Sequence, residues 1–169
     1  MSNYNRWQQA REQGLKAANR FEKICLEQDY LFQKSTRNQD MKEHWDYEIC
    51  KDDKCLKVEV KSAKRLKRGD AEVLYSILYL EHRNVSGNLG WLYGKADLVA
   101  FEQKEGFILI GAAKLVELWE KLVDKLEFTK NPKLYKSYRR KDRPGEHVSL
   151  ILVSDILKEK HIIWTEKVD

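Results

Sequence analysis

The sequence has little proline, glycine or cysteine, and each shortage excludes a class of protein. Two Pro and eight Gly among 169 residues exclude collagen-like and low-complexity chains. Three cysteines, Cys25, Cys50 and Cys55, are too few and too scattered for a disulfide framework or a four-ligand zinc site. We therefore expect reduced thiols in a cytoplasmic protein.

Long apolar runs are also missing. No run approaches the roughly 18 residues of a membrane span, and the stretch Met1–Trp7 lacks the apolar core of a signal peptide. We therefore expect no membrane partner. What is present is 42% hydrophobic residues with five Trp and eight Tyr, which excludes a disordered chain even though 35% of residues are charged. The net charge of +5 fits a nucleic-acid binder but is shared by many unrelated proteins.

Residue periodicity predicts one α/β (α+β) domain over residues 1–169, with a central mixed β-sheet flanked by helices. Apolar residues at three- and four-residue steps predict helices, whereas polar–apolar alternation predicts strands. The predicted core covers about residues 6–126, and a basic loop at 130–145 and a C-terminal strand and tail at 147–169 follow it. The predicted elements are helices over 6–29 and 112–126 and strands over 44–50, 55–61, 73–81, 96–102, 106–111 and 148–153.

The first predicted hairpin brings two carboxylates together. If its turn is centred between Asp52 and Asp53, Asp46 lies opposite Glu59, with roughly 5 Å between their β-carbons. Like charges opposed in this way destabilise a sheet unless a positive charge lies between them, and a hard divalent cation takes carboxylate oxygens as ligands. Lys61, on the same face, is placed to orient a water or to stabilise a charged phosphorus transition state.

A structural interpretation of the same face stays open. Glu48 and Lys57 would form an ordinary cross-strand ion pair, and the whole face could be a solvated sheet surface. The pattern acidic-x-Lys is common in so charged a chain, and only one of its copies lies in an alternating strand with an Asp on the partner strand. The copies are Asp40–Lys42, Asp52–Lys54, Glu59–Lys61 and Glu102–Lys104, and the third has that context.

Two short motifs resemble the core of the PD-(D/E)xK nuclease superfamily, which includes restriction endonucleases, Holliday-junction resolvases and phage recombination nucleases. The motifs are His44-Trp45-Asp46-Tyr47 and, after a short turn, Val58-Glu59-Val60-Lys61. The family pattern is an Asp on one strand and acidic-x-Lys on the next, often with a Glu on the preceding helix, which Glu22 matches. Trp45 stands where the family name has Pro. The resemblance covers roughly residues 15–120.

The resemblance implies a restriction-endonuclease-like αβββαβ core and a metal-dependent endonuclease that hydrolyses DNA phosphodiester bonds. It implies that Asp46, Glu59 and the Val60 carbonyl bind Mg²⁺ or Mn²⁺, that Lys61 positions the attacking water, and that Glu22 supports the metal or its water. Exposed Glu is common on helices, so Glu22 also has a purely structural interpretation. The alternative function is a catalytically inactive, nuclease-like module that binds DNA or a protein.

Positive charge is concentrated in two runs. Lys61–Arg68 carries five cations, and residues 130–143 carry seven, with Tyr135 and Tyr138 among them. Beside a phosphodiesterase motif, these runs predict DNA as the partner, with RNA also open; a solvated surface loop is the alternative. A homodimer would suit cutting of both strands. The candidate nucleic-acid contacts are Lys64, Arg65, Lys67, Arg68, Lys133, Lys136, Arg139 and Arg140.

Several neighbouring residues stay undecided. Glu81 could add a carboxylate to the site, although ending a buried strand is the simpler role. Lys95 and Asp97 could pair with each other or contact phosphate, and Trp91 is expected to pack in the core. Cys50 and Cys55 face each other on the predicted hairpin and could oxidise in air, which a reducing cytosol would make incidental.

Overall fold

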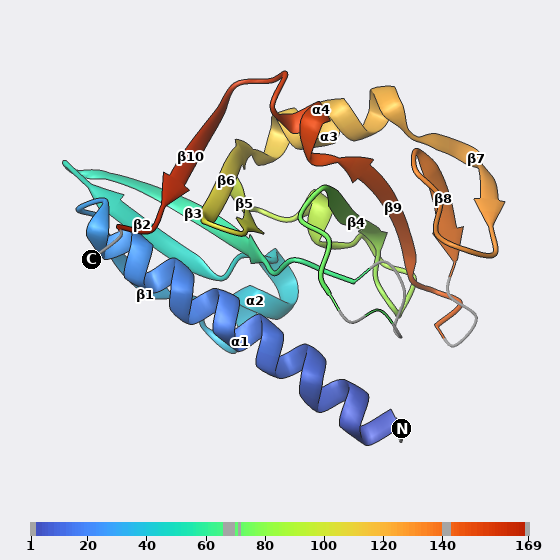
Figure 1. Cartoon of the computed structure of the whole chain (residues 1–169), viewed down its shortest axis with the longest axis horizontal. Coiled ribbons are helices and arrows are strands. Elements are labelled where there is room, and N and C mark those ends of the chain that lie inside the picture. Colours follow the sequence, from blue (N-terminus) through green and yellow to red (C-terminus); the bar gives the residue numbers. More distant parts are fainter. Residues whose placement is uncertain (1–2, 66–69, 71, 140–142, 168–169) are drawn as a thin grey trace.

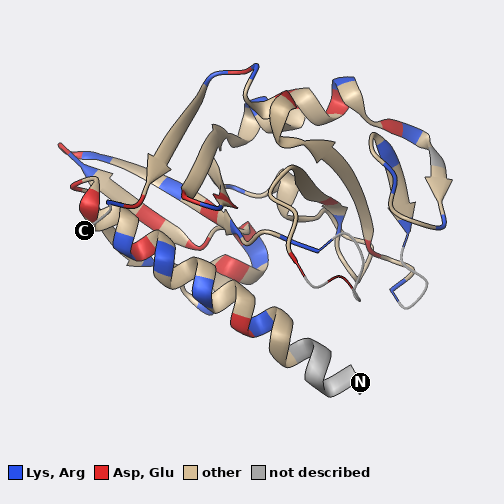
Figure 2. Cartoon of the chain, viewed as in Figure 1, with Lys and Arg blue, Asp and Glu red and all other residues tan. Residues whose placement is uncertain are grey.

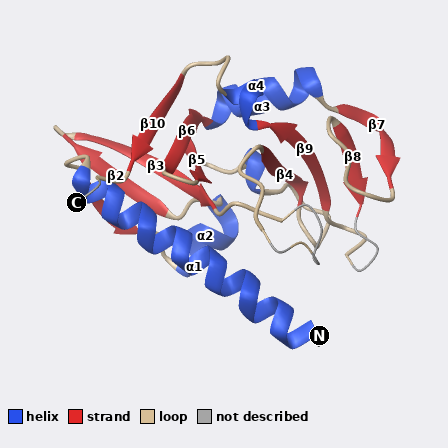
Figure 3. Ribbon diagram, viewed as in Figure 1, coloured by secondary structure: helices blue, strands red, loops and turns tan. Residues whose placement is uncertain are grey.

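The computed structural model describes residues 3–65, 70, 72–139 and 143–167, apart from the side chains of residues 3–7 and 127. Of the candidate nucleic-acid contacts, Lys67, Arg68 and Arg140 lie outside the described residues. Two β-sheets and four α-helices make up the described chain (Figures 1 and 3). The predicted mixed α/β class is therefore correct.

The first sheet has six strands in the order β1–β2–β3–β5–β6–β10. β3 and β5 run parallel and every other neighbouring pair runs antiparallel, so the sheet is mixed, as predicted. The strands are β1 (Leu31–Lys34), β2 (Tyr47–Lys51), β3 (Lys54–Lys61), β5 (Leu98–Gln103), β6 (Gly106–Gly111) and β10 (His161–Thr165).

The β2–β3 hairpin has the predicted register, with Tyr47 opposite Val58 and Cys50 opposite Cys55. Its turn residues Asp52 and Asp53 have φ angles of 49° and 60°. A two-residue hairpin turn needs such positive φ values, and Asp tolerates them better than most residues do. The turn chemistry therefore sets the register, and the register decides which side chains share a face.

The second sheet has four strands in the order β4–β9–β8–β7, and it was not predicted as a separate sheet. The strand predicted at 73–81 is β4 (Ile77–Arg83), and it pairs with β9 (His147–Leu152) rather than with the central sheet. The predicted basic loop at 130–145 contains β8 (Lys136–Arg139), which runs parallel to β7 (Asp124–Thr129). The loop prediction is wrong here because polar and charged residues can form a strand when neighbouring strands satisfy its backbone, as β9 and β7 do on the two sides of β8.

The helices lie on both faces of the first sheet. α1 (Asn3–Glu27) covers one face, with Phe21 and Ile24 buried against Tyr47 and Phe107 (Figure 1). α3 (Ala112–Leu122) and the second sheet cover the other face through one shared core. α2 (Arg37–Glu43), the short α4 (Val153–Ile156) and the 3-10 helix η1 (Trp91–Tyr93) complete the fold. Among the described residues, no helix is both long enough and apolar enough to cross a membrane.

The order of elements agrees with αβββαβ only in its first part. α1 and the strands β1, β2 and β3 follow one another, with α2 inserted, and β5 lies parallel to β3. In the described part of residues 62–97, β4 and η1 stand where the pattern has a helix. The predicted helix over 112–126 ends at Leu122 because Val123 is extended, and Leu126 lies 95% exposed on β7.

Candidate active site

Asp46 and Glu59 meet where β2 begins beside β3. The backbone N–H of Asp46 donates to the Val58 carbonyl at 2.9 Å, and the Asp46 carboxylate accepts from the Val60 N–H at 2.7 Å. Asp46 therefore bonds to the residues on both sides of Glu59. The two carboxylates are close enough for the charge of Glu59 to act on Asp46.

Glu59 is a buried carboxylate with one unsatisfied oxygen. The residue is 4% exposed, and its Oε1 forms an ion pair with the Lys61 ammonium. Its Oε2 is buried without a hydrogen-bond partner, and among the described residues it is the only such side-chain atom on the first sheet. A buried acceptor without a partner costs about 1–3 kcal/mol. A cation bound at Oε2 would remove that cost.

Asp46 is held in an environment that disfavours its charge. Burial, together with the neighbouring Glu59 carboxylate, raises the pKa of Asp46 to about 7, although Lys61 and the Val60 N–H act in the opposite direction. A carboxyl with that pKa is only partly ionised near neutral pH. Binding of a divalent cation would favour its ionised form, because carboxylate oxygens are hard ligands.

Lys61 lies over an aromatic ring and among three carboxylates. Its Nζ is 4.5 Å from the centroid of the Trp91 ring, and its side chain is 24% exposed. Burial alone lowers the pKa of Lys61, but Glu59, Asp46 and Glu81 outweigh it, so the pKa lies above its usual value. Lys61 is therefore a charged donor at neutral pH and not a base.

Glu22 lies in a different environment from the other predicted site residues. Its carboxylate accepts from the Tyr47 hydroxyl at 2.7 Å and pairs with Lys34 Nζ at 2.8 Å. Burial raises the pKa of Glu22, but these two partners lower it by more, so the net shift is downward. Tyr47 belongs to the core under α1. In the structure, Glu22 therefore connects α1 to β1 through Lys34 and to β2 through Tyr47.

The Val60 carbonyl is positioned by the β3 backbone. In an antiparallel ladder the N–H and C=O of one residue point to the same side of the strand. The Val60 N–H bonds to Asp46, so its carbonyl is also directed toward the Asp46 side of β3. A third oxygen ligand is thus available beside the two carboxylates.

Lys95 and Asp97 form contacts that hold the loop before β5 in place, and they do not pair with each other. Lys95 Nζ pairs with Glu43 at 3.1 Å, and the Asp97 carboxylate accepts from the Lys57 N–H at 2.8 Å. Trp91 and Glu81, by contrast, contribute to the environment of Lys61. In the sequence, Trp91 and Glu81 stand out only as parts of the runs that begin at Gly90 and at Glu81. No local pattern indicates that their side chains lie near Lys61 of β3.

Both basic runs contain exposed cations and cations with partners in the protein. Lys64 and Arg65, shortly after β3, are exposed, as are Lys133 and Arg139, and the Lys64 ammonium donates to the Ser62 hydroxyl at 3.1 Å. Lys136 pairs with Asp124 at 2.8 Å, and the Arg139 guanidinium lies 4.7 Å from the Phe128 ring centroid. Figure 2 shows Lys and Arg interspersed with Asp and Glu along α1 and across the first sheet. The described cations therefore do not form one uniform positive face.

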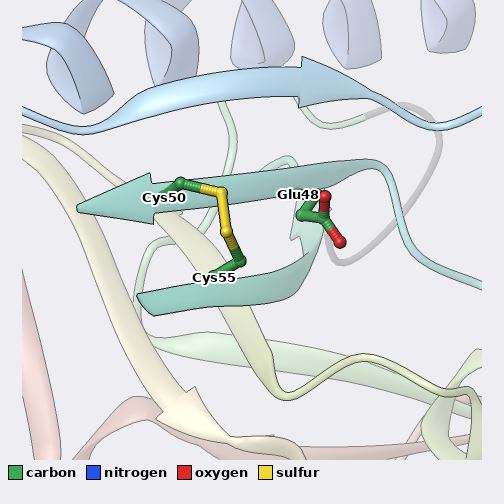
Figure 4. Close-up of side chains that lie close together, drawn as sticks. All are labelled: Glu48, Cys50 and Cys55. Atoms are coloured by element: carbon green, nitrogen blue, oxygen red, sulfur yellow. A yellow bond between two sulfur atoms is a disulfide. The ribbon is translucent and has the colours of Figure 1, made fainter. Parts of the chain in front are cut away.

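The two hairpin cysteines form a disulfide, contrary to the prediction of reduced thiols. Cys50 and Cys55 are cross-strand partners with their Cα atoms 4.1 Å apart, so the register itself brings their sulfurs together (Figure 4). With Glu48 they make the one group of three possible ligands found among the described residues. Bonded sulfurs are not metal ligands. Cys25 is free and buried, and burial raises its pKa to about 11.

Comparison of the chain with protein-family models, with curated proteins and with solved structures finds no match in any of the three.

Proposed function

We propose that this protein is a metal-dependent endonuclease of the PD-(D/E)xK kind that hydrolyses DNA phosphodiester bonds. The observation that carries the proposal is the buried, unpartnered Oε2 of Glu59 beside a second carboxylate, Asp46. A purely structural sheet would gain from replacing either acid, because like charges destabilise a buried pair. The presence of both acids at this position is consistent with a cation site.

The donor set suits a hard divalent cation. The Asp46 and Glu59 carboxylates, with the Val60 carbonyl, would hold Mg²⁺ or Mn²⁺, since these ions prefer oxygen ligands. When bound, such an ion supplies Lewis-acid stabilisation of a phosphoryl oxygen and lowers the pKa of a coordinated water. The charge of Asp46 and Glu59 would then be neutralised in place.

Lys61 acts beside the carboxylates as a positively charged donor. Its ammonium, held protonated by the surrounding acids, is placed to orient the attacking water and to stabilise charge on the phosphorus as it develops. The Trp91 ring limits its access to water, which strengthens its interaction with an anionic substrate. Glu22 has no part in this proposal, because its partners are Tyr47 and Lys34.

The substrate proposal depends on cations near the end of β3. Lys64 and Arg65 are exposed and follow Lys61 by three and four residues, so they are placed to contact phosphates on either side of the scissile bond. Contacts of this kind read the backbone and not the bases, so we expect little sequence preference. A homodimer and a cytoplasmic location stay predictions.

The direct test is cleavage of labelled duplex, branched and single-stranded DNA with Mg²⁺ or Mn²⁺. We expect cleavage by the natural chain and a loss of at least about 100-fold in Glu59→Ala and Lys61→Ala variants. Glu48→Gln is the matched control, because it removes a carboxylate two residues from Asp46 on the same strand and should leave cleavage intact. Cleavage that persists in purified Glu59→Ala would refute the site.

An inactive DNA-binding or protein-binding module is the second candidate. The ion pair between Lys61 and Glu59 favours it, because an internal cation already neutralises one of the two acids. Calorimetric titration with Mn²⁺ distinguishes the candidates. No binding at millimolar Mn²⁺, together with intact DNA binding, would favour the module.

A further inference from the structure

Strand β4 of the second sheet and the 3-10 helix η1 each supply one residue to the surroundings of Lys61. Glu81 lies in β4, paired with Val148 of β9, and Trp91 begins η1. Between them, Gly90 packs directly on Glu81: a Cβ at Gly90 would lie 2.4 Å from the Glu81 carbonyl oxygen and 3.0 Å from its Cγ. The Gly90 N–H also donates to the His82 carbonyl at 3.1 Å. The backbone therefore fixes Glu81 and Trp91 against each other.

Lys61 joins this pair to the first sheet. Its ammonium lies on the Trp91 ring, pairs with Glu59 two residues away, and is also within electrostatic reach of Glu81. Two acids from different sheets thus act on one cation. In the metal-free protein, Lys61 is the counter-ion of Glu59.

A divalent cation at Glu59 would compete with Lys61 for the same carboxylate. Two positive charges a few ångströms apart repel strongly in a partly buried site. The ammonium must therefore either leave the site or find another acid. Glu81 is the acid that the second sheet provides, and Trp91 offers a ring face that favours a cation throughout the movement.

We propose that Glu81 is a positioning residue that takes over the Lys61 ammonium when a divalent cation occupies Glu59 and Asp46. The inference depends on the proposed function, since it assigns a role to a residue outside the three ligands and the lysine. Lys61 pivots from Glu59 towards Glu81 and remains on Trp91, so its charge stays beside the scissile phosphate. Glu81 itself does not contact the metal.

The test is a double-mutant cycle read out as Mn²⁺ affinity by calorimetry, with no substrate present. Glu81→Gln should weaken Mn²⁺ binding about five-fold, because the Lys61 ammonium then has no charged Glu81 to move to and stays paired with Glu59. Lys61→Met should tighten binding, because the competing ammonium is gone. In the Lys61→Met background, Glu81→Gln should have almost no further effect.

Two controls make the result specific. Glu43→Gln removes a half-buried carboxylate that pairs with Lys57 and Lys95 instead of Lys61, so it should leave Mn²⁺ affinity unchanged. Glu81→Asp keeps the charge and should restore at least part of the affinity. Circular dichroism and thermal melting establish that each variant is folded, and Glu81→Ala serves as the test variant if Glu81→Gln does not fold.

The outcomes separate the inference from the proposed function. An equal loss from Glu81→Gln with and without Lys61 would overturn the inference, since Glu81 would then act on the metal directly. Normal Mn²⁺ binding with no effect of Glu81→Gln would also overturn it but would leave the endonuclease proposal standing. No Mn²⁺ binding by the natural chain would overturn both.

Discussion

Two regions rich in charge behave differently in this protein. In the first, called here the carboxylate cluster, Asp46, Glu59 and Glu81 surround Lys61, and one carboxylate oxygen of Glu59 is buried without a partner. In the second, the basic strand β8, each described cation has its own local partner. Lys136 pairs with Asp124, and Arg139 lies on Phe128.

The difference comes from how strands distribute their side chains. Along a single strand, alternation separates consecutive side chains onto opposite faces, so a run of cations becomes dispersed. Across a hairpin, register brings chosen residues together, so a few acids become concentrated. Charge that is forced together and buried is costly to keep. It is therefore better evidence of a functional site than a charged run is.

The substitution expected to lower stability most is at Gly90, which packs against Glu81 of the carboxylate cluster. Gly90→Ala would place a Cβ against the Glu81 backbone, so we expect a loss of about 3 kcal/mol in the free energy of unfolding. Urea denaturation measures it. Gly14→Ala is the control, because Gly14 is an exposed residue of α1 with no atom within 4 Å of an added Cβ, and it should stabilise by about 1 kcal/mol. Equal stability of Gly90→Ala and the natural chain would contradict the packing described.

Within the carboxylate cluster, Asp46 should make the stability of the protein depend on pH. Because the folded pKa of Asp46 is raised to about 7 from 3.8, the folded state holds a proton that the unfolded state releases. The contribution of Asp46 to the stability of the metal-free protein should therefore be greatest at acid pH, fall as pH rises from about 4 to about 7, and level off above that. Glu22, His82 and Asp155, whose pKa values are lowered, contribute in the opposite direction, so the Asp46 contribution is read as the difference between variants.

Asp46→Asn should remove this fall while keeping an acceptor for the Val60 N–H. We expect a gain of about 2 kcal/mol at pH 8 in the presence of a chelator, with allowance for the partial exposure of Asp46. Asp97→Asn is the matched control, since Asp97 also accepts a backbone N–H from β3. A fall of the same size in Asp46→Asn would show that another group is responsible.

The third prediction compares the two basic runs directly. In the Glu59→Ala background, Lys64→Ala with Arg65→Ala should reduce the salt dependence of DNA binding by nearly two units of slope. Lys136→Ala with Arg139→Ala should change it by less than about one unit, because these cations belong to β8 of the second sheet, whereas Lys64 and Arg65 follow the strand that carries Glu59 and Lys61. Fluorescence anisotropy at several salt concentrations provides the slopes. Equal slopes for the two double variants would remove the distinction between the runs.

The smallest effect is expected at the disulfide. Reduction of Cys50–Cys55 should change Mn²⁺ affinity by less than about two-fold, since Mn²⁺ prefers oxygen ligands to thiolates. Calorimetry with and without reductant measures it. A large gain in Mn²⁺ affinity on reduction would indicate that the metal binds at Glu48 and the two cysteines instead.

Local interactions made parts of the fold predictable. The apolar stripe of α1 and the two-residue turn of the β2–β3 hairpin are both set by nearby residues, and both lie where the sequence indicates. α2 was missed although its signal was present: Thr36 and Gln39 form a capping box. β1 was missed because it has four residues, mostly exposed, and therefore no alternation to detect.

The site was predictable only where it depends on one hairpin. Asp46 and Glu59 are brought together by a single turn, so alternation was sufficient to place them side by side. Glu81 and Trp91 reach Lys61 through packing of the second sheet on the first, which no local pattern contains. Glu22 was assigned from a family pattern, but the direction of its side chain depends on how α1 docks on Tyr47.

The contact between Lys61 and Trp91 also couples ligand binding at the candidate site to local unfolding of the residues that cover it. Lys61 belongs to the last residues of β3, whereas Trp91 and Glu81 belong to the layer that packs over it. Opening of that layer would expose Lys61 to water and remove both of its partners there. A ligand at Glu59 should therefore slow the opening between the two sheets. Amide protons of β4 and η1 should then exchange with solvent more slowly as the occupancy of the site rises.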